Sequence, residues 1–257
     1  MANSGVAPAL RLSGVQAHIG AYHILHGVDL AVPEGEVTVL LGRNGAGKTT
    51  TLRTIMGLVA VSQGEIGFRG AAIHGRETPD ISRLGIAWVP ESMGIFTDLT
   101  VQENMVLAAR QARHAGDLDR ARLDWIFGHF PAMKKFWLYP AGKLSGGQKQ
   151  MLAVSRAIIE PRALILIDEP SKGLAPSIVQ NLITALRELK AQKTTILLVE
   201  QNFAMARALG DTVAVMDNGR TVHHGTMAAL ASDEELQQRL LGLSLGHASD
   251  HTQGVPA

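Results

Sequence analysis

The chain contains no cysteine, and its charges almost cancel. Without a thiol it has no disulfide framework, no cysteine-ligated zinc site and no dithiol redox pair, which suits a reducing compartment. Lysine and arginine number 24 against 23 aspartates and glutamates, which gives a net charge of +1 with histidine neutral. Binding to a phosphate backbone usually needs a clear basic excess. The composition therefore argues against a disulfide-stabilised protein and against a nucleic-acid partner.

Long apolar runs are missing as well. The longest have the length of a strand, such as residues 163–167, whereas a membrane-spanning helix needs about 20 consecutive apolar residues. Residues 1–8 also lack the basic start and the apolar run of a secretory signal peptide. Any role at a membrane is therefore expected to come through a partner protein.

Aromatic residues are scarce and unevenly placed. Tryptophan, tyrosine and phenylalanine make up 4% of the chain, and most of them lie between residues 88 and 139. The same part of the sequence has helical periodicity over residues 101–110 and 118–127. We expect a small helical subdomain whose core most of these rings fill, while some rings could line a docking groove.

Apolar, β-branched runs alternate with helical patterns along the rest of the chain. The runs expected as core strands are residues 37–41, 164–167, 195–199 and 213–216. This alternation is typical of a mostly parallel sheet with helices packed on it. The helical subdomain, about residues 92–155, begins after the first core strand and ends before the second. We therefore interpret it as an insertion into an α/β domain.

A glycine-rich loop follows the first core strand. It fits the phosphate-binding loop pattern residue for residue and consists of Gly42, Arg43, Asn44, Gly45, Ala46, Gly47, Lys48 and Thr49, with Thr50 next in line. Backbone N–H groups of such a loop surround phosphate oxygens, and the helix that begins there adds a favourable dipole. Lys48 is expected to hold the β- and γ-phosphates of a nucleotide, and the Thr49 hydroxyl to ligate Mg²⁺. The alternative is a glycine-rich turn with a chance lysine, and the flanking strand and helix argue against it.

Two adjacent carboxylates, Asp168 and Glu169, end the second core strand. Side chains alternate along a strand, so the two acids are expected to do different work. Asp168 fits the magnesium partner of phosphate-loop enzymes, and Glu169 is left to orient or deprotonate the attacking water. The alternative is a pair of solvated acids at a strand end, which is less favoured when a phosphate loop precedes it.

A third motif lies between the loop and the acids. Leu144 is followed by Ser145, Gly146, Gly147 and Gln148, and an apolar helical pattern comes after them. One interpretation is a simple helix start, since Ser145 is a good N-cap. A cap does not need two successive glycines, however, and bare backbone at a helix start offers a second anion site. A nucleotide held by another phosphate loop would suit that site.

With these three motifs in order, the sequence resembles the ATP-binding-cassette family over about residues 10–243. The resemblance implies an α/β fold of the P-loop NTPase type with a RecA-like core, an N-terminal antiparallel β subdomain and an inserted helical subdomain. It implies ATP and Mg²⁺ as cofactors. It also implies a dimer with a second ATPase subunit, identical or different, in which the signature at residues 144–148 of one subunit closes over the nucleotide of the other. Residues 1–9 and 244–257 are then expected as tails, the second one disordered.

Three positions depart from the usual pattern of that family. Glu91 stands where a glutamine beside the magnesium is usual, Ala175 where an aspartate is usual, and Gln201 where a histidine is usual. By its place, Glu91 is expected at the metal site. Gln201 is expected to donate to the γ-phosphate and to act with Lys48 and Glu169 in catalysis. The alternative is that Gln201 only caps a turn before the next helix.

A further departure concerns the adenine. The family usually stacks this base on an aromatic residue just before the glycine at position 20, but Ile19 stands there. Tyr22 is the expected substitute. The alternative is that Tyr22 only packs in the N-terminal sheet.

The stretches at residues 89–91, 95–104, 173–176 and 199–202 are similar to those of bacterial ATPases of branched-chain amino-acid importers. That likeness implies integral membrane permease subunits as partners, a periplasmic solute-binding protein indirectly, and a peripheral place on the cytoplasmic face of the inner membrane. Related cassettes for urea, other amides or lipopolysaccharide look similar.

Two alternatives belong to other functional classes. The first is a soluble cassette ATPase of DNA repair, chromosome organisation or translation. Such proteins usually carry two cassettes in one chain or long coiled-coil or basic insertions, which 257 near-neutral residues do not accommodate. The second is a regulatory cassette that binds ATP without cleaving it, and the presence of Lys48, Asp168 and Glu169 argues against it.

Overall fold

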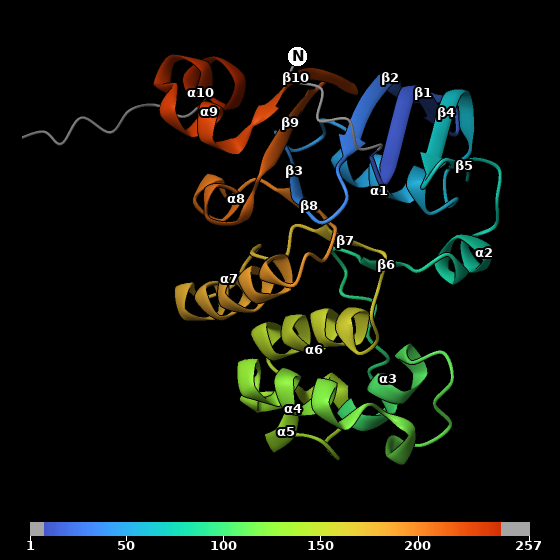
Figure 1. Cartoon of the computed structure of the whole chain (residues 1–257), viewed down its shortest axis with the longest axis vertical. Helices are drawn as coiled ribbons and strands as arrows, with labels where there is room; N and C mark the ends of the chain where they lie inside the picture. Colours follow the sequence, from blue (N-terminus) through green and yellow to red (C-terminus); the bar gives the residue numbers. More distant parts are fainter. Residues whose placement is uncertain (1–7, 243–257) are drawn as a thin grey trace, which may run out of the picture.

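The structure, a computed structural model, describes residues 8–242 and contains two β-sheets (Figure 1). The larger has six strands in the order β10-β9-β3-β8-β7-β6. They are β3 (Val37–Gly42), β6 (Ile86–Val89), β7 (Leu164–Asp168), β8 (Ile196–Glu200), β9 (Thr212–Asp217) and β10 (Arg220–Thr226). Strands β9 to β6 pair in parallel, and β10 closes one edge antiparallel to β9. The four predicted core strands are confirmed as β3, β7, β8 and β9.

The large sheet is buried on both faces, because its strands send alternate residues into two separate hydrophobic cores. In β3, for example, Val39 and Leu41 enter one core and Leu40 enters the other. Helix α1 (Lys48–Ile55) packs in the core of Leu40 through Leu52 and Ile55. Helices α6 (Gly146–Ile158), α7 (Pro176–Ala191) and α8 (Phe203–Leu209) pack in the core of Val39. The nucleotide-loop helix and the signature helix therefore lie on opposite faces of the sheet.

The second sheet covers α1 from the outer side (Figure 1). Its strand order is β2-β1-β4-β5, and each strand is antiparallel to its neighbours. Its strands are β1 (Leu10–Ile19), β2 (Tyr22–Val32), β4 (Val61–Phe68) and β5 (Ala71–Ala72), and α2 (Thr78–Arg83) leads from it to β6. This arrangement confirms the expected N-terminal antiparallel β subdomain.

A group of helices lies below the large sheet in Figure 1, where the inserted helical subdomain was expected. It contains α3 (Val101–Ala108), the 3-10 turns η1 (Ala115–Asp117) and η2 (Ala141–Lys143), α4 (Arg120–His129), α5 (Pro131–Lys135) and α6. The helix predicted over 118–127 begins later, at Arg120, because the Asp119 side chain accepts the N–H of Arg122 and caps the first turn there. Leu118 instead ends η1.

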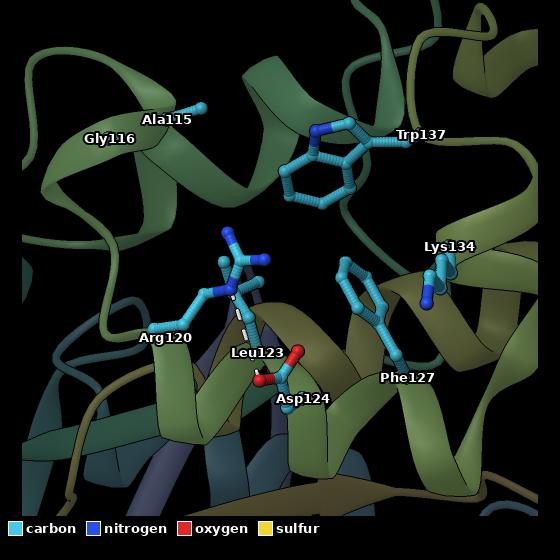
Figure 2. Close-up of a pocket in the computed structure, with 8 residues that line it drawn as sticks. All are labelled: Ala115, Gly116, Arg120, Leu123, Asp124, Phe127, Lys134 and Trp137. Carbon is cyan, nitrogen blue, oxygen red and sulfur yellow. Dashed lines mark ion pairs between the residues drawn. The ribbon is translucent and has the colours of Figure 1, made fainter.

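Most aromatic rings of this region pack against its core, as predicted. Phe130 is fully buried, and Trp125, Phe127, Phe136 and Trp137 are partly buried against the same cluster. Figure 2 shows Phe127 and Trp137, whose rings meet edge to face at 5.3 Å, as one wall of an open cavity of about 410 Å³. Phe96 and Tyr139 are exceptions, since 49% and 43% of their surfaces are exposed.

The C-terminal part returns to the large sheet through α9 (Met227–Ser232) and α10 (Glu234–Leu241). The tail predicted over 244–257, and most of the one predicted over 1–9, lie outside the described residues. Across the described part of the chain, every helix is too short or too polar to cross a membrane.

Candidate functional site

The glycine-rich loop leaves the sheet at the end of a fully buried strand and turns directly into a helix. All six residues of β3 are buried, and α1 begins at Lys48. A side chain at Gly42 would place its Cβ 2.5 Å from the carbonyl oxygen of Met216, so only glycine fits between β3 and β9. Thr49 and Thr50 occupy the first turn of α1. The predicted phosphate-loop geometry of strand, loop and helix is therefore present.

Lys48 is buried inside this loop, with 4% of its surface exposed. Its Nζ donates to the carbonyl oxygens of Gly42 at 2.8 Å and Arg43 at 3.1 Å. It also forms an ion pair with Glu169 Oε1 at 3.2 Å. An ammonium group held this way is fixed beside the backbone N–H groups that would surround a phosphate.

The two acids at the end of β7 have different partners, as the strand alternation predicted. Asp168 is 1% exposed, and its Oδ1 accepts the Thr49 hydroxyl at 3.2 Å. Its Oδ2 is also buried and has no hydrogen-bond partner among residues 8–242. Burial raises the pKa of Asp168 to about 6, although the Thr49 hydrogen bond lowers it in part. The alternative of two solvated acids is wrong, because both carboxylates are buried.

Glu169 faces Lys48 and the end of β8 rather than Thr49. It is 8% exposed, and its backbone is in the left-handed region at φ 46°. Non-glycine residues rarely adopt this conformation, and such strain is concentrated at functional sites. Its Oε1 accepts the Gln201 amide at 2.6 Å, and its Oε2 lies 3.8 Å from Lys172 Nζ. Two lysines and one amide therefore surround one buried carboxylate.

Gln201 connects this carboxylate to the glycine-rich loop. Besides Glu169, its Nε2 donates to Asn44 Oδ1 at 2.7 Å. The N-cap of α8 is Asn202, whose side chain accepts the N–H of Met205, so the helix cap and Gln201 are separate residues. The strand order explains the meeting: β8 lies between β3 and β7, and the three parallel strands end at the same edge.

One residue that the sequence did not single out organises this edge. Glu200, the last residue of β8, is 1% exposed and accepts the N–H and hydroxyl of Ser171 as well as the N–H groups of Gln201 and Asn202. Burial raises its pKa, and these hydrogen bonds act in the opposite direction. A buried glutamate so engaged fixes where Gln201 leaves the sheet. An acidic residue at the end of an otherwise apolar strand was the available signal.

The predicted metal residues fit Mg²⁺ to different degrees. Mg²⁺ usually takes only one or two protein ligands beside water and phosphate oxygens. The Thr49 hydroxyl and the unpartnered Oδ2 of Asp168 supply such ligands. Glu91 is 43% exposed at its side chain and is paired with Lys172 at 2.5 Å. Within the described residues, no three histidine or acidic side chains gather as an all-protein metal site.

The signature residues form a helix cap. The Ser145 hydroxyl accepts the N–H of Gln148 at 3.4 Å, and the Gln148 side chain accepts the N–H of Ser145 at 2.9 Å. The helix-start interpretation is thus right about their local geometry. Gly147 packs on Ile178 of α7, whereas a Cβ on Gly146 would meet nothing within 4 Å. Across residues 8–242, no hydrogen bond or ion pair joins the signature to the glycine-rich loop.

Tyr22 opens β2 opposite Ile19, and the two residues are 75% and 41% exposed. A side chain so exposed does not pack into the core of the N-terminal sheet. The two side chains form an exposed apolar pair at the turn between β1 and β2.

A second cavity, of about 380 Å³, lies where the chain leaves β6 for the helical insertion. Trp88, Met93, Arg156 and Arg162 are among the residues that line it. The Arg156 guanidinium lies over the Phe96 ring at 5.1 Å and donates to the carbonyl of Gly94. Arg156 gives this cavity a positive group, whereas Arg162 is paired with Glu160 at 3.2 Å.

Comparison with known proteins agrees with this arrangement. A family described as ABC transporter matches residues 25–172. The high-affinity branched-chain amino acid transport ATP-binding protein BraG of Pseudomonas aeruginosa is 37% identical over 91% of this chain and 99% of that protein. The Probable branched-chain amino acid transport ATP-binding protein LivF of Archaeoglobus fulgidus is 33% identical over the same shares of both chains.

The fold has solved counterparts. A structure described as the ATP binding subunit of an ABC transporter is 29% identical, with a TM-score of 0.75 over 92% of this chain and 96% of that one. The family match covers more than half of the chain, and both relatives are matched along nearly their whole length. The chain therefore belongs to the ABC transporter family, as one of its ATP-binding subunits.

Proposed function

We propose that the protein hydrolyses ATP to drive an importer of branched-chain or related amino acids. In this proposal it works with a second ATPase subunit and membrane permease subunits, on the cytoplasmic face of the membrane, and a periplasmic solute-binding protein delivers the cargo. The observation that carries the catalytic part is the convergence of Lys48 and Gln201 on the buried carboxylate of Glu169.

Each group has a distinct task in the proposed reaction. The loop N–H groups and Lys48 bind the phosphates, and Glu169 accepts a proton from the attacking water or orients it. The two N–H groups of the Gln201 amide donate to Asn44 and Glu169, and in this proposal one of them turns to the γ-phosphate when ATP binds. Preorganised donors of this kind stabilise charge that develops in the transition state.

Thr49 and Asp168 are the residues that would hold Mg²⁺, and Glu91 lies further out, beside Lys172. When bound, the ion would neutralise part of the phosphate charge while the phosphoryl group is transferred to water. The raised pKa of Asp168 fits this role, since a buried carboxylate without a counter-charge gains most when a cation binds.

The position of the signature supports a second subunit. Its helix α6 and the loop helix α1 lie on opposite faces of the same sheet, in separate cores. One chain therefore does not bring both to a single nucleotide. We propose that Ser145, Gly146, Gly147 and Gln148 of one subunit close over the nucleotide in the loop of the other, with bare backbone at Gly146 toward phosphate.

The cavity near Met93 is the proposed docking site for the permease. It lies next to Glu91, on the segment that connects the catalytic edge to the helical insertion. Movement of this segment would couple hydrolysis to transport. The positive charge of Arg156 favours a permease segment that presents acidic or carbonyl groups.

The cargo is the most specific part of the proposal. It is supported by the branched-chain transport named for both relatives. Cargo selection belongs to the permease and the solute-binding protein, so urea, other amides or lipopolysaccharide are the competing cargoes. Tyr22 is the proposed adenine contact, because it is exposed beside the position that the family uses.

Three measurements test the proposed function. Phosphate release by the isolated protein with MgATP separates an ATPase from a regulatory cassette, which would bind ATP and release none. Co-purification with integral membrane proteins separates a transporter subunit from a soluble cassette ATPase. Uptake of leucine, but not urea, by vesicles that contain the whole complex would then support the proposed cargo.

A further inference from the structure

The C-terminal end of the described chain reaches the glycine-rich loop. Helix α10 ends at Leu241 and is capped by Gly242, which has φ 66° and donates its N–H to the carbonyl of Gln238. An ideal Cβ on Gly242 would stand 2.6 Å from Nη2 of Arg43 and 3.6 Å from its Cζ. The guanidinium of Arg43 therefore lies directly against the bare Cα of Gly242, at a position where the left-handed backbone also favours glycine.

This contact is part of a longer interface between α10 and the edge of the large sheet where β3 and β8 end. The apolar side chains Leu236, Leu240 and Leu241 seat the helix against the main core. A small cavity of about 120 Å³ separates its end from the loop and is lined by Leu41, Gly42, Arg43, Gln201, Phe203 and Leu241. The helix thus ends beside both the loop and Gln201.

The side chain of Arg43 lies near Gly242, whereas its backbone carbonyl faces Lys48. Its carbonyl oxygen accepts Lys48 Nζ at 3.1 Å and the N–H of Ala46 at 3.2 Å. The side chain of Arg43 is exposed and its tip lies against the end of α10, while its peptide group is one wall of the cradle around Lys48. Anything that limits the movement of the Arg43 side chain therefore also limits its carbonyl group, which orients Lys48.

We propose that Arg43 is a positioning residue, clamped by the C-terminal end of α10, and that this clamp raises the ATP affinity of the subunit. A cation beside the carbonyl end of a helix is electrostatically favoured, which stabilises the clamped arrangement. A loop held in its binding conformation loses less entropy when the nucleotide binds. The proposal rests on the proposed phosphate-binding role of the loop and is independent of the cargo.

The test measures binding of a non-hydrolysable ATP analogue with Mg²⁺ by isothermal titration calorimetry. In Gly242→Ala the new methyl displaces the guanidinium, and we expect about threefold to tenfold weaker binding. Arg43→Ala should weaken binding to a similar degree, and Arg43→Lys, which keeps the charge but loses the planar group, should restore only part of it. In the double variant the loss should not exceed that of Arg43→Ala alone, because both changes remove the same contact.

A matched control separates the clamp from simple strain. Gly75 also has positive φ, 80°, but a Cβ there meets nothing within 4 Å. Gly75→Ala should lower the melting temperature about as much as Gly242→Ala and leave nucleotide binding unchanged. Equal affinities of the Gly242→Ala and Gly75→Ala variants, or additive losses in the double variant, would overturn the clamp while leaving the proposed function intact. A wild-type protein that binds no ATP analogue would overturn both.

Discussion

The amide of Gln201 donates to the carboxylate of Glu169 at 2.6 Å. The same Nε2 atom donates to Asn44 in the glycine-rich loop at 2.7 Å. The residue that stands in the usual place of a histidine is therefore in contact with both the proposed base and the loop. This geometry makes its contribution to turnover measurable.

Gln201→Ala should lower the ATP turnover number by roughly 100-fold and leave ATP affinity nearly unchanged, because a donor to developing charge acts in the transition state. Gln201→His should stay active. It should also gain a pH dependence near pH ~6.5, where imidazole titrates, whereas glutamine stays neutral. Steady-state kinetics between pH 5.5 and 8.5 check both results.

The control for Gln201 is the adjacent cap. Asn202→Ala removes the N-cap of α8, which should cost about 1 kcal/mol of stability, without a comparable loss of turnover. Near-normal turnover of Gln201→Ala would show that Gln201 is structural.

Glu169→Gln should bind ATP and stall its cleavage, since the amide keeps the shape of the carboxylate and lacks its basic oxygen. The uncleaved nucleotide should then hold two subunits together. Light scattering at saturating MgATP should report a dimer for this variant. Lys48→Ala should stay monomeric because it loses nucleotide binding itself. A monomeric Glu169→Gln protein would contradict either the dimer or the role of Glu169.

Asp168→Asn should stabilise the metal-free protein at pH 7.5. The pKa of Asp168 is raised from 3.8 to about 6 in the folded state, so the folded state holds the proton more tightly than the unfolded state. The resulting stability is complete below pH 3.8 and is lost as the pH rises through 6. The buried charge then costs about 3 kcal/mol, which the amide removes.

Urea unfolding without Mg²⁺ at pH 7.5 and pH 4.5 measures this difference. The gain of Asp168→Asn should appear at the higher pH and shrink at the lower one, while Mg²⁺-dependent turnover is lost. Asp98→Asn changes an exposed aspartate and serves as the control. A gain of equal size at both pH values would mean that ionisation of Asp168 is not its source.

Met93→Cys should cross-link to the permease in the assembled complex. Met93 lines the cavity at the start of the helical insertion, and the chain has no cysteine of its own to compete. A short bifunctional thiol reagent and a permease with single cysteines on its cytoplasmic loops provide the assay. Val222→Cys, on the edge strand β10 and 50% exposed, is the control position. Cross-linking that is no stronger at residue 93 than at residue 222 would place the docking site elsewhere.

Local sequence patterns were sufficient for the four core strands and the motifs of this protein. The apolar runs predicted all four core strands, because burial on both faces of a parallel sheet demands continuous apolar residues. The spacing of Gly42 to Thr49 predicted the loop, because a phosphate cradle needs glycines and a lysine at fixed positions. The helix at Arg120 was placed two residues too early, since a capping hydrogen bond, not periodicity, decides the first turn.

Only the tertiary structure decided which residues meet. Gln201 reaches Asn44 and Glu169, which are 157 and 32 positions away, because the order of the sheet places β8 between β3 and β7. Glu200 is buried for the same reason, and Arg43 meets Gly242 because α10 folds back onto the end of β3. Periodicity in a sequence reports which face of an element is apolar. It carries no information on strand order, which is set by how whole elements share two cores.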